Sequence, residues 1–436
     1  MERPEPTPAS IESDAASTAS PALKLPISRR GLIAATAATG LVAVASPPII
    51  SARGETTVKV GWIDPLSGTY AALGKSQVDG AHMALAEINK NGGILGHQVE
   101  ILVQDGAAEV GQSVDKLNGL VDKDHVNFTA GSVSSAVAQA CSHAANLKNI
   151  LYVAVGGHVD TVTGVDCYWN TFKTCSDTWM LAKALSSVLL NKFGKRWYFS
   201  TPDYSWGHFL YKGFSEILAK AGGTNLGNAL MPLGSTDFSS VLIKVEQAKP
   251  DVFIVLQGGD DFVNLMKQAT QFGMTKKMAF GYGLVELEPL AALPPEARLG
   301  WGVMEWWWDQ PNQPHVKTFV AEYRKQYNLT PSARSWLGYA SMHSIALAAN
   351  KAKSLQSIKV SHALAGLHMP PNVALEPNNP YYRVGDHQCM LTEFVGEVNQ
   401  KGKYPDLFTV ADEIPGDKLA QTPAEKSCKL SYPTSS

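Results

Sequence analysis

Residues 126–157 read VNFTAGSVSSAVAQACSHAANLKNILYVAVGG and contain the unit that predicts the fold. An apolar, β-branched run ends at Gly131, a helical stripe follows, and a second apolar run begins at Ile150. The stripe repeats every three or four residues, as one face of a helix does, through Val137, Ala140, Cys141, Ala144 and Leu147. Strand, helix and strand in succession predict a parallel sheet covered by helices.

The same alternation extends in both directions. Strand-like runs at 57–64 and 98–105 are separated by a helical stripe that ends at Gly92-Gly93. After Cys175 the pattern restarts with a helix over 178–190 and the strand RWYFST at 196–201. The last third predicts two helices, then two strands within 381–398, and mostly loop after Pro405.

We therefore predict an α/β fold of two lobes, each a mainly parallel sheet flanked by helices, joined by three crossovers. Lobe 1 is expected to hold 56–176 plus 305–383, and lobe 2 to hold 177–304 plus 384–436. The stretch EWWWDQP, 305–311, lies where the chain crosses back to lobe 1. Three consecutive tryptophans cannot all face one side of a strand, so we expect them to pack at the hinge.

The first 45 residues predict an export signal. Arg29 and Arg30 precede a short apolar run, and Ala43-Val44-Ala45 forms a small-x-small cleavage site before prolines. The paired arginines favour the twin-arginine route, with residues 1–45 removed. A membrane anchor is the alternative, but the run over 31–45 is shorter than the roughly 20 residues that span a bilayer. We expect a periplasmic protein.

The net charge and the cysteine spacing indicate which kinds of ligand and covalent bond the protein has. The net charge of −2 offers no basic footprint for nucleic acid. Export permits disulfides, and Cys141 falls on the helical stripe as a buried free thiol. The other four cysteines allow three pairings; we expect two bridges, Cys167 with Cys175 and Cys389 with Cys428. Without clustered ligands such as CxxC, we expect no metal and no cofactor.

Ser132, Ser134 and Ser135 sit where a strand ends and a helix opens. The stretch lacks the second glycine of GxSxG, and HExxH, Walker A and dinucleotide motifs are missing, so we expect no catalytic residue and no enzyme. In an open α/β sheet this edge binds ligands, and helix N-terminal amides attract anions. The serines either bind an anion or only cap the helix; position alone leaves both open.

Four stretches in order carry a family resemblance: GWIDPLSGTYAALGKSQVDGAHMALAEINKNGGILGHQVEILVQD, GSVSSAVAQA, TDFSSVLIKVEQAKPDVFIV and LMKQATQFG. Over about 56–398 the chain resembles the type I periplasmic binding proteins of ABC transporters, in the Leu/Ile/Val-binding branch. The resemblance implies a monomer that captures a small molecule between two closing lobes and delivers it to permease subunits in the inner membrane. A sensory ligand-binding module is the alternative.

The resemblance also implies a ligand site. The anion-binding serine falls on Ser135, beside Ser134, and the next strand-end loop is Gly156-Gly157-His158. Its backbone carbonyl, which holds an ammonium in the family, falls on Gly156, and His158 replaces a threonine. The covering aromatic from lobe 2 falls on Trp206.

The remaining implied positions depart from the family pattern. Tyr70 or Leu73 forms a wall, and Asp260 takes a usually aromatic position. The carboxylate that pairs with an amino group is missing where Tyr282 stands, and Glu286 serves only if its loop is shifted. We therefore expect a carboxylate ligand without an α-amino group, aromatic or branched, with a branched-chain amino acid, another amino acid or an amide as the alternative.

Overall fold

The computed structural model describes residues 57–433, so the predicted export signal lies outside the described residues. The described residues belong to one compact unit, within which two large sheets each have their own cores. The α/β prediction with mainly parallel sheets is confirmed.

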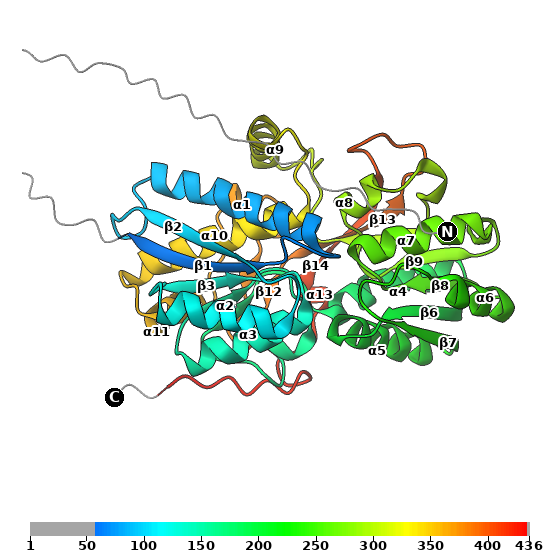
Figure 1. The fold of residues 1–436 in the computed structure, drawn as a ribbon, viewed down its shortest axis with the longest axis horizontal. Coiled ribbons are helices and arrows are strands. Elements are labelled where there is room, and N and C mark those ends of the chain that lie inside the picture. The colour runs from blue at the N-terminus through cyan, green and yellow to red at the C-terminus, as the bar shows by residue number, and fades with distance from the viewer. Residues whose placement is uncertain (1–56, 434–436) are drawn as a thin grey trace, which may run out of the picture. The chain divides into compact units, whose positions relative to one another are not determined.

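The first sheet has the strand order β2-β1-β3-β4-β5, and every pairing is parallel. Its strands are β1 (Val58–Asp64), β2 (Val99–Asp105), β3 (Phe128–Gly131), β4 (Tyr152–Ala154) and β5 (Thr171–Lys173). Helices α1 (Ala71–Lys90) and α10 (Ala333–Ala352) cover one face, and α2 (Val110–Asp122) and α3 (Ser135–Leu147) cover the other (Figure 1). The register aligns Gly131 with both Ile63 and Ala154, so the loops after three strands lie side by side.

The second sheet has the order β14-β13-β10-β9-β8-β6-β7, with antiparallel pairing only at β10-β13-β14. Its strands are β6 (Arg196–Pro202), β7 (Thr224–Met231), β8 (Val252–Val255), β9 (Ala279–Tyr282), β10 (Trp301–Met304), β13 (Thr392–Val398) and β14 (Phe408–Pro415). Helices α4 (Thr178–Lys192) and α5 (Ser205–Lys220) pack on one face, and α6 (Ser239–Ala248) and α7 (Gly259–Gln271) pack on the other.

The remaining elements complete the two lobes. They are η1 (Asp160–Thr163), η2 (Met274–Lys276), α8 (Leu287–Ala291), η3 (Pro295–Ala297), α9 (Pro314–Tyr327), α11 (Ser357–Leu364), α12 (Pro371–Ala374), β11 (Tyr381–Tyr382), β12 (Cys389–Met390) and α13 (Gly416–Leu419). The chain passes between the sheets after β5, after β10 and after β12. The lobe boundaries given above stay a prediction; β12 pairs with β11, and Cys389 packs in the core that contains α1 and α10.

Close approach of two helices positions one wall of the site. A Cβ on Gly80 of α1 would lie 1.8 Å from the Ser335 carbonyl oxygen, and one on Gly338 of α10 would lie 1.9 Å from that of Gln77. Only glycine allows the two backbones to meet at these points. The N-terminal turn of α10 is thereby held against α1.

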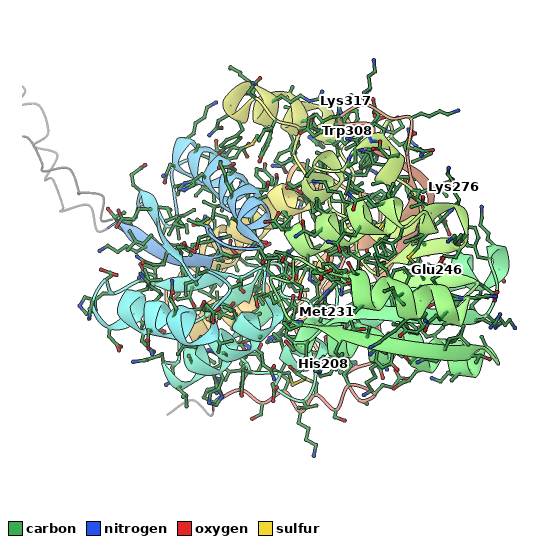
Figure 2. All side chains as sticks on the ribbon, turned by 45° about the vertical axis from the view of Figure 1, so that its right-hand side comes forward. His208, Met231, Glu246, Lys276, Trp308 and Lys317 are labelled. Atoms are coloured by element: carbon green, nitrogen blue, oxygen red, sulfur yellow. A yellow bond between two sulfur atoms is a disulfide. The ribbon has the colours of Figure 1, made fainter. Side chains whose placement is uncertain are left out.

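The predicted packing of the three tryptophans is confirmed. Trp306 is buried in the core of the first sheet, and Trp307 is buried in a core of the second. Trp308 packs against both cores, and the Arg324 guanidinium lies 4.9 Å from its ring centroid. Figure 2 labels Trp308, and its label for Lys317 marks α9, the helix that also carries Arg324.

The C-terminal tail differs from the sequence prediction. Residues expected to be loop form β14, an edge strand that pairs antiparallel with β13. Most of its side chains are partly or fully exposed, so the strand carries little apolar signal. Beyond α13 the tail contacts the first sheet's lobe, where His387 Nε2 lies 2.9 Å from Tyr432 Oη, although the sequence analysis assigned these residues to lobe 2.

The predicted disulfide pairing is wrong. Cys167 bonds Cys428 with a Cα–Cα distance of 5.7 Å, while Cys175 and Cys389 are free and buried in the core of the first sheet. The tail brings Cys428 to Cys167, and such contacts between distant segments cannot be read from spacing. The expected buried free thiol at Cys141 is confirmed, and burial raises its pKa to about 12.

Candidate functional site

A small cavity of about 20 Å³ lies between the two lobes. From the first lobe it is lined by Tyr70, Leu73, Val133, Ser135, His158 and Arg334. From the second lobe it is lined by Tyr204, Trp206, Gln257, Gly258, Leu284 and Glu286. Loops at the carboxyl ends of parallel strands supply much of this lining, as the strand-end rule expects.

The structure brings five predicted site residues together at this cavity, namely Tyr70, Leu73, Ser135, His158 and Trp206. Ser134, Gly156 and Gly157 lie behind this wall. Ser134 is the N-cap residue of α3, but its side chain makes no capping hydrogen bond. A Cβ on Gly157 would lie 2.3 Å from the Cβ of Ala138, so this loop is pressed against α3.

Two predicted site residues lie elsewhere. Tyr282 is buried in the core of the second sheet, where its hydroxyl donates a 2.6 Å hydrogen bond to the Leu299 carbonyl. Asp260 is exposed on α7, and its backbone N–H donates to the Thr69 carbonyl at 3.2 Å. The chain turns into α7 at Gly259, whose φ is +56°, so the preceding Gln257 and Gly258 line the cavity instead.

Arg334 is the principal cavity residue that the sequence analysis missed. It lies in the first turn of α10, is 4% exposed, and donates from Nη1 to the Gly156 carbonyl at 3.0 Å. A Cβ on Gly156 would sit 2.1 Å from Nη1, so this approach requires glycine. The sequence did contain a signal for this residue: Arg334 is the lone arginine of the mainly apolar stretch SARSWLGYASMHSIALAAN, and a buried arginine needs a partner.

Glu286 is the second-lobe partner of Arg334. Its Oε1 accepts a hydrogen bond from Arg334 Nε, and both side chains are buried. Burial alone would lower the pKa of Arg334, but the carboxylates of Glu286 and Glu305 raise it above its usual value. The two acceptors expected to hold a ligand ammonium, the Gly156 carbonyl and Glu286, are thus both engaged by the guanidinium.

Further contacts join the lobes around the cavity. The hydroxyls of Tyr70 and Tyr204 lie 2.6 Å apart, and a Cβ on Gly259 would meet the Thr69 carbonyl at 2.4 Å. Trp206 Nε1 donates to the Leu256 carbonyl at 2.8 Å, which fixes the ring edge-on to His158 with centroids 5.1 Å apart. The lobes therefore contact each other on more than one side of the cavity.

Gln257 adds a polar group to the second-lobe wall. Its Nε2 donates to Ser200 Oγ at 2.8 Å, and its Oε1 has no hydrogen-bond partner within residues 57–433. The residue is 3% exposed, so this acceptor is costly unless a ligand or water satisfies it. The sequence contains a signal for Gln257, because this residue directly follows the apolar run VFIVL and so lies at a strand end. Tyr204 lies two residues before Trp206, in the loop after the strand RWYFST, and could have been predicted in the same way.

His158, Cys175 and Glu305 form the candidate metal cluster of the described residues, with ligand atoms within 4.8 Å of one another. Both Glu305 oxygens already accept hydrogen bonds, from His158 Nε2 at 2.9 Å and from the Ser176 N–H at 2.7 Å. Burial raises the pKa of the Cys175 thiol well above its usual value. A protonated thiol and a satisfied carboxylate favour a hydrogen-bond network over a metal centre.

Comparison with known proteins identifies the fold and the family. Residues 57–403 match the family model described as periplasmic binding protein. The chain belongs to this family. It is 26% identical over 336 residues to the Leu/Ile/Val-binding protein homolog 7 of Brucella suis, covering 73% of this chain and 83% of that protein.

Solved structures of periplasmic binding proteins agree. The crystal structure of a periplasmic binding protein from Burkholderia mallei has a TM-score of 0.80 and 28% identity, covering 86% of this chain and 99% of that one. A solute-binding protein of an ABC transporter from Rhodopseudomonas palustris, in complex with 3,4-dihydroxybenzoic acid, has a TM-score of 0.75 and 20% identity, covering 85% and 99%. The second likeness shows the fold alone.

Membership confirms the resemblance to type I periplasmic binding proteins of the Leu/Ile/Val-binding branch. The protein is a solute-binding component of ABC transporters and not an enzyme. Periplasmic binding proteins are exported to the periplasm. No helix within residues 57–433 combines the length and apolarity needed to cross a membrane.

Proposed function

We propose that this binding protein captures a small carboxylate without an α-amino group, aromatic in preference, and delivers it to the permease of an ABC importer in the inner membrane. The observation that carries the proposal is the position of Arg334. Its guanidinium donates to the Gly156 carbonyl and to Glu286, the two groups that an ammonium would need. A ligand ammonium would compete with a fixed cation for both acceptors.

The first-lobe wall supplies donors for an anion. Ser135 lines the cavity at the first turn of α3, where helix amides and the helix dipole favour negative charge. His158 Nε2 is engaged by Glu305, so Nδ1 is the ring nitrogen available to a ligand. Arg334 and Glu286 form a buried ion pair, so together they add no net charge to the site.

The remaining walls suit a flat or branched body. Trp206, Tyr70 and Leu73 present broad apolar surface, with Val133 and Leu284 beside them. The unpartnered Oε1 of Gln257 would accept a hydrogen bond from a ring hydroxyl. The complex of the Rhodopseudomonas palustris protein with 3,4-dihydroxybenzoic acid supports this class, because that ligand has an aromatic ring, a carboxyl group and hydroxyls.

In this proposal Ser135, His158, Tyr70, Leu73 and Trp206 contact the ligand, and Arg334, Glu286, Tyr204 and Gln257 join them. Ser134, Gly156 and Gly157 shape the wall, while Tyr282 and Asp260 make no ligand contact. The first lobe binds the carboxylate, and closure brings Trp206 over the ligand. The protein acts as a monomer in the periplasm.

A branched-chain amino acid is the second candidate. It is favoured by the relatives named Leu/Ile/Val-binding proteins. In that case Arg334 would have to release Glu286, which would then accept from the ligand ammonium.

Calorimetry on protein freed of co-purified ligand by partial unfolding and refolding separates these candidates. We expect binding of benzoate and 3,4-dihydroxybenzoate, at least roughly hundredfold weaker binding of uncharged benzamide, and weaker binding of leucine. Micromolar leucine binding without a response to any carboxylic acid lacking an amino group would overturn the proposal and indicate Glu286 as the ammonium partner.

A further inference from the structure

Gln257 is a buried polar residue in the second-lobe wall of the cavity. It is 3% exposed and lies between the end of β8 and the start of α7. Its Nε2 donates to Ser200 Oγ at 2.8 Å, and Ser200 is itself fully buried on β6. This hydrogen bond orients the amide group of Gln257, and Oε1 is left without a hydrogen-bond partner within residues 57–433.

The backbone next to Gln257 is held in place from two sides. The Leu256 N–H donates to the Ser200 carbonyl at 3.0 Å, which continues the pairing of β8 with β6. The Leu256 carbonyl accepts from Trp206 Nε1 at 2.8 Å, so the residue before Gln257 is also bound to an aromatic residue of the cavity. The fold therefore fixes the position of the Gln257 amide before any ligand binds, and a ligand that meets it need not order it.

Gln257 differs from two other buried glutamines by its place at the cavity. In the described part of the chain, Gln77 and Gln310 also have an Oε1 without a hydrogen-bond partner, but neither residue lines the cavity. Gln257 does line it, so a bound molecule reaches this side chain. A buried acceptor without a partner lowers stability, and a ligand that donates to it regains that free energy on binding.

We propose that Gln257 is a specificity-determining residue, which selects ligands that carry a hydrogen-bond donor, such as a ring hydroxyl, at the end remote from the carboxylate. The inference rests on the proposed function, because it takes Ser135 of the first lobe as the carboxylate site and Gln257 of the second lobe as the opposite end.

The size of the cavity sets when this contact forms. A space of about 20 Å³ has room for about one water molecule, so a ligand enters when the lobes part and meets Gln257 as they close around it. A ligand hydroxyl then donates to Oε1. A methyl group of similar size leaves this acceptor buried and unpaired, which is the condition under which a binding site rejects an analogue that lacks a hydroxyl.

Calorimetry with pairs of ligands of similar size tests the inference. The pairs are 4-hydroxybenzoate with 4-methylbenzoate and 3-hydroxybenzoate with 3-methylbenzoate, which place the hydroxyl at either ring position. We expect the unmodified protein to bind the hydroxyl member of at least one pair roughly tenfold to hundredfold more tightly than the methyl member. Gln257→Met, which keeps the length of the side chain, should bring that ratio to about one by weakening the hydroxyl ligand.

Gln310→Met is the matched control, because it removes a buried glutamine whose Oε1 also lacks a partner but which does not line the cavity. It should keep the affinity ratio of the unmodified protein. A ratio near one for both pairs in the unmodified protein would overturn the inference and indicate that water satisfies Oε1. A preference for the hydroxyl ligand that Gln257→Met leaves unchanged would also overturn it.

Failure of the inference and failure of the proposed function give different results. Tight and equal binding of both members of each pair leaves the proposed function standing and overturns the inference alone. If amino acids bind and none of these acids does, the proposed function fails, and threonine with valine becomes the pair of similar size. A preference for threonine that Gln257→Met removes and Gln310→Met keeps then supports the inference, and equal affinity for threonine and valine overturns it.

Discussion

Two buried cations, Arg334 beside the cavity and Lys426 in the C-terminal tail, are each held by carboxylates, yet they do different things. Lys426 Nζ lies 2.8 Å from Asp386, 3.1 Å from Thr163 Oγ1 and 3.3 Å from Asp177. An ammonium has three donors, and these contacts account for all of them. Lys426 is therefore a structural cation.

Arg334 has donors left over. A guanidinium has five N–H donors, of which the contacts to Glu286 and Gly156 use those on Nε and Nη1. Arg334 also lines the cavity, whereas Lys426 does not. Free donors that face the cavity thus distinguish Arg334, which we propose to take part in binding, from Lys426, whose donors are all used within the fold.

The C-terminal tail connects the two lobes in addition to the three passages of the chain between the sheets. β14 belongs to the second sheet, and Cys428 is bonded to Cys167 in the first lobe. The segment between Pro415 and Cys428 thus spans the lobes as a covalently fixed strap. Lys426 lies within it, next to Asp177, the N-cap residue of α4.

The largest expected effect concerns Lys426. Lys426→Met leaves the buried Asp177 without its cation, while Asp386 keeps Arg383, so we expect the free energy of unfolding to fall by about 3–5 kcal/mol. Urea denaturation measures it, with exposed Lys429→Met as the control. Benzoate affinity should not change. An unaltered urea midpoint would show that the tail cation does not stabilise the fold.

Breaking the strap is expected to have the next largest effect. Cys428→Ser should lower the free energy of unfolding by about 2–4 kcal/mol, because the long loop closed by the disulfide is released in the unfolded chain. A reductant should destabilise the unmodified protein to the same extent and leave the variant unchanged. In the unmodified protein, thiol counting by mass spectrometry should find three free thiols before reduction. One free thiol would restore the two-bridge prediction.

Replacing the ion pair between Arg334 and Glu286 should have the opposite effect to the two changes in the tail. Ligand binding should be lost, and the free energy of unfolding should be kept. Replacing both partners, Arg334→Met with Glu286→Gln, leaves no unpaired charge, so the urea midpoint should change little. Benzoate affinity should fall roughly hundredfold, about 2.8 kcal/mol. Arg383→Met, which breaks a pair with Asp386 near the tail, is the matched control and should lower stability only. Retained benzoate affinity in the double variant would remove Arg334 from the site.

The smallest expected effect concerns two serines of α3, Ser135 at the cavity and Ser142 away from it. Ser135→Ala removes one hydrogen bond to an anion, so calorimetry should show roughly tenfold weaker benzoate binding, about 1.4 kcal/mol. Ser142→Ala on the same helix, whose hydroxyl donates to the Gln139 carbonyl, should bind as the unmodified protein does. Equal affinity of both variants would mean that Ser135 only begins the helix.

Local patterns predicted the parts of the fold that are buried on both faces. The strands at 58–64 and 128–131 and the stripe of α3 carry strong apolar signals, and the structure has them. β14 was missed because an edge strand exposes much of its length and needs no apolar run. The strand-end rule brought Ser135 to the site, and the family resemblance added His158, without any knowledge of the other lobe.

The sequence by itself determined the α/β architecture through its periodicity, and it determined the family and part of the first-lobe wall through the resemblance of four ordered stretches. Only the tertiary structure decided the pairing of Cys167 with Cys428 and the engagement of Arg334 by Gly156 and Glu286. These contacts join segments far apart in the sequence. Whether a charge is satisfied there depends on distances that the two lobes set when they pack, and no local pattern encodes them.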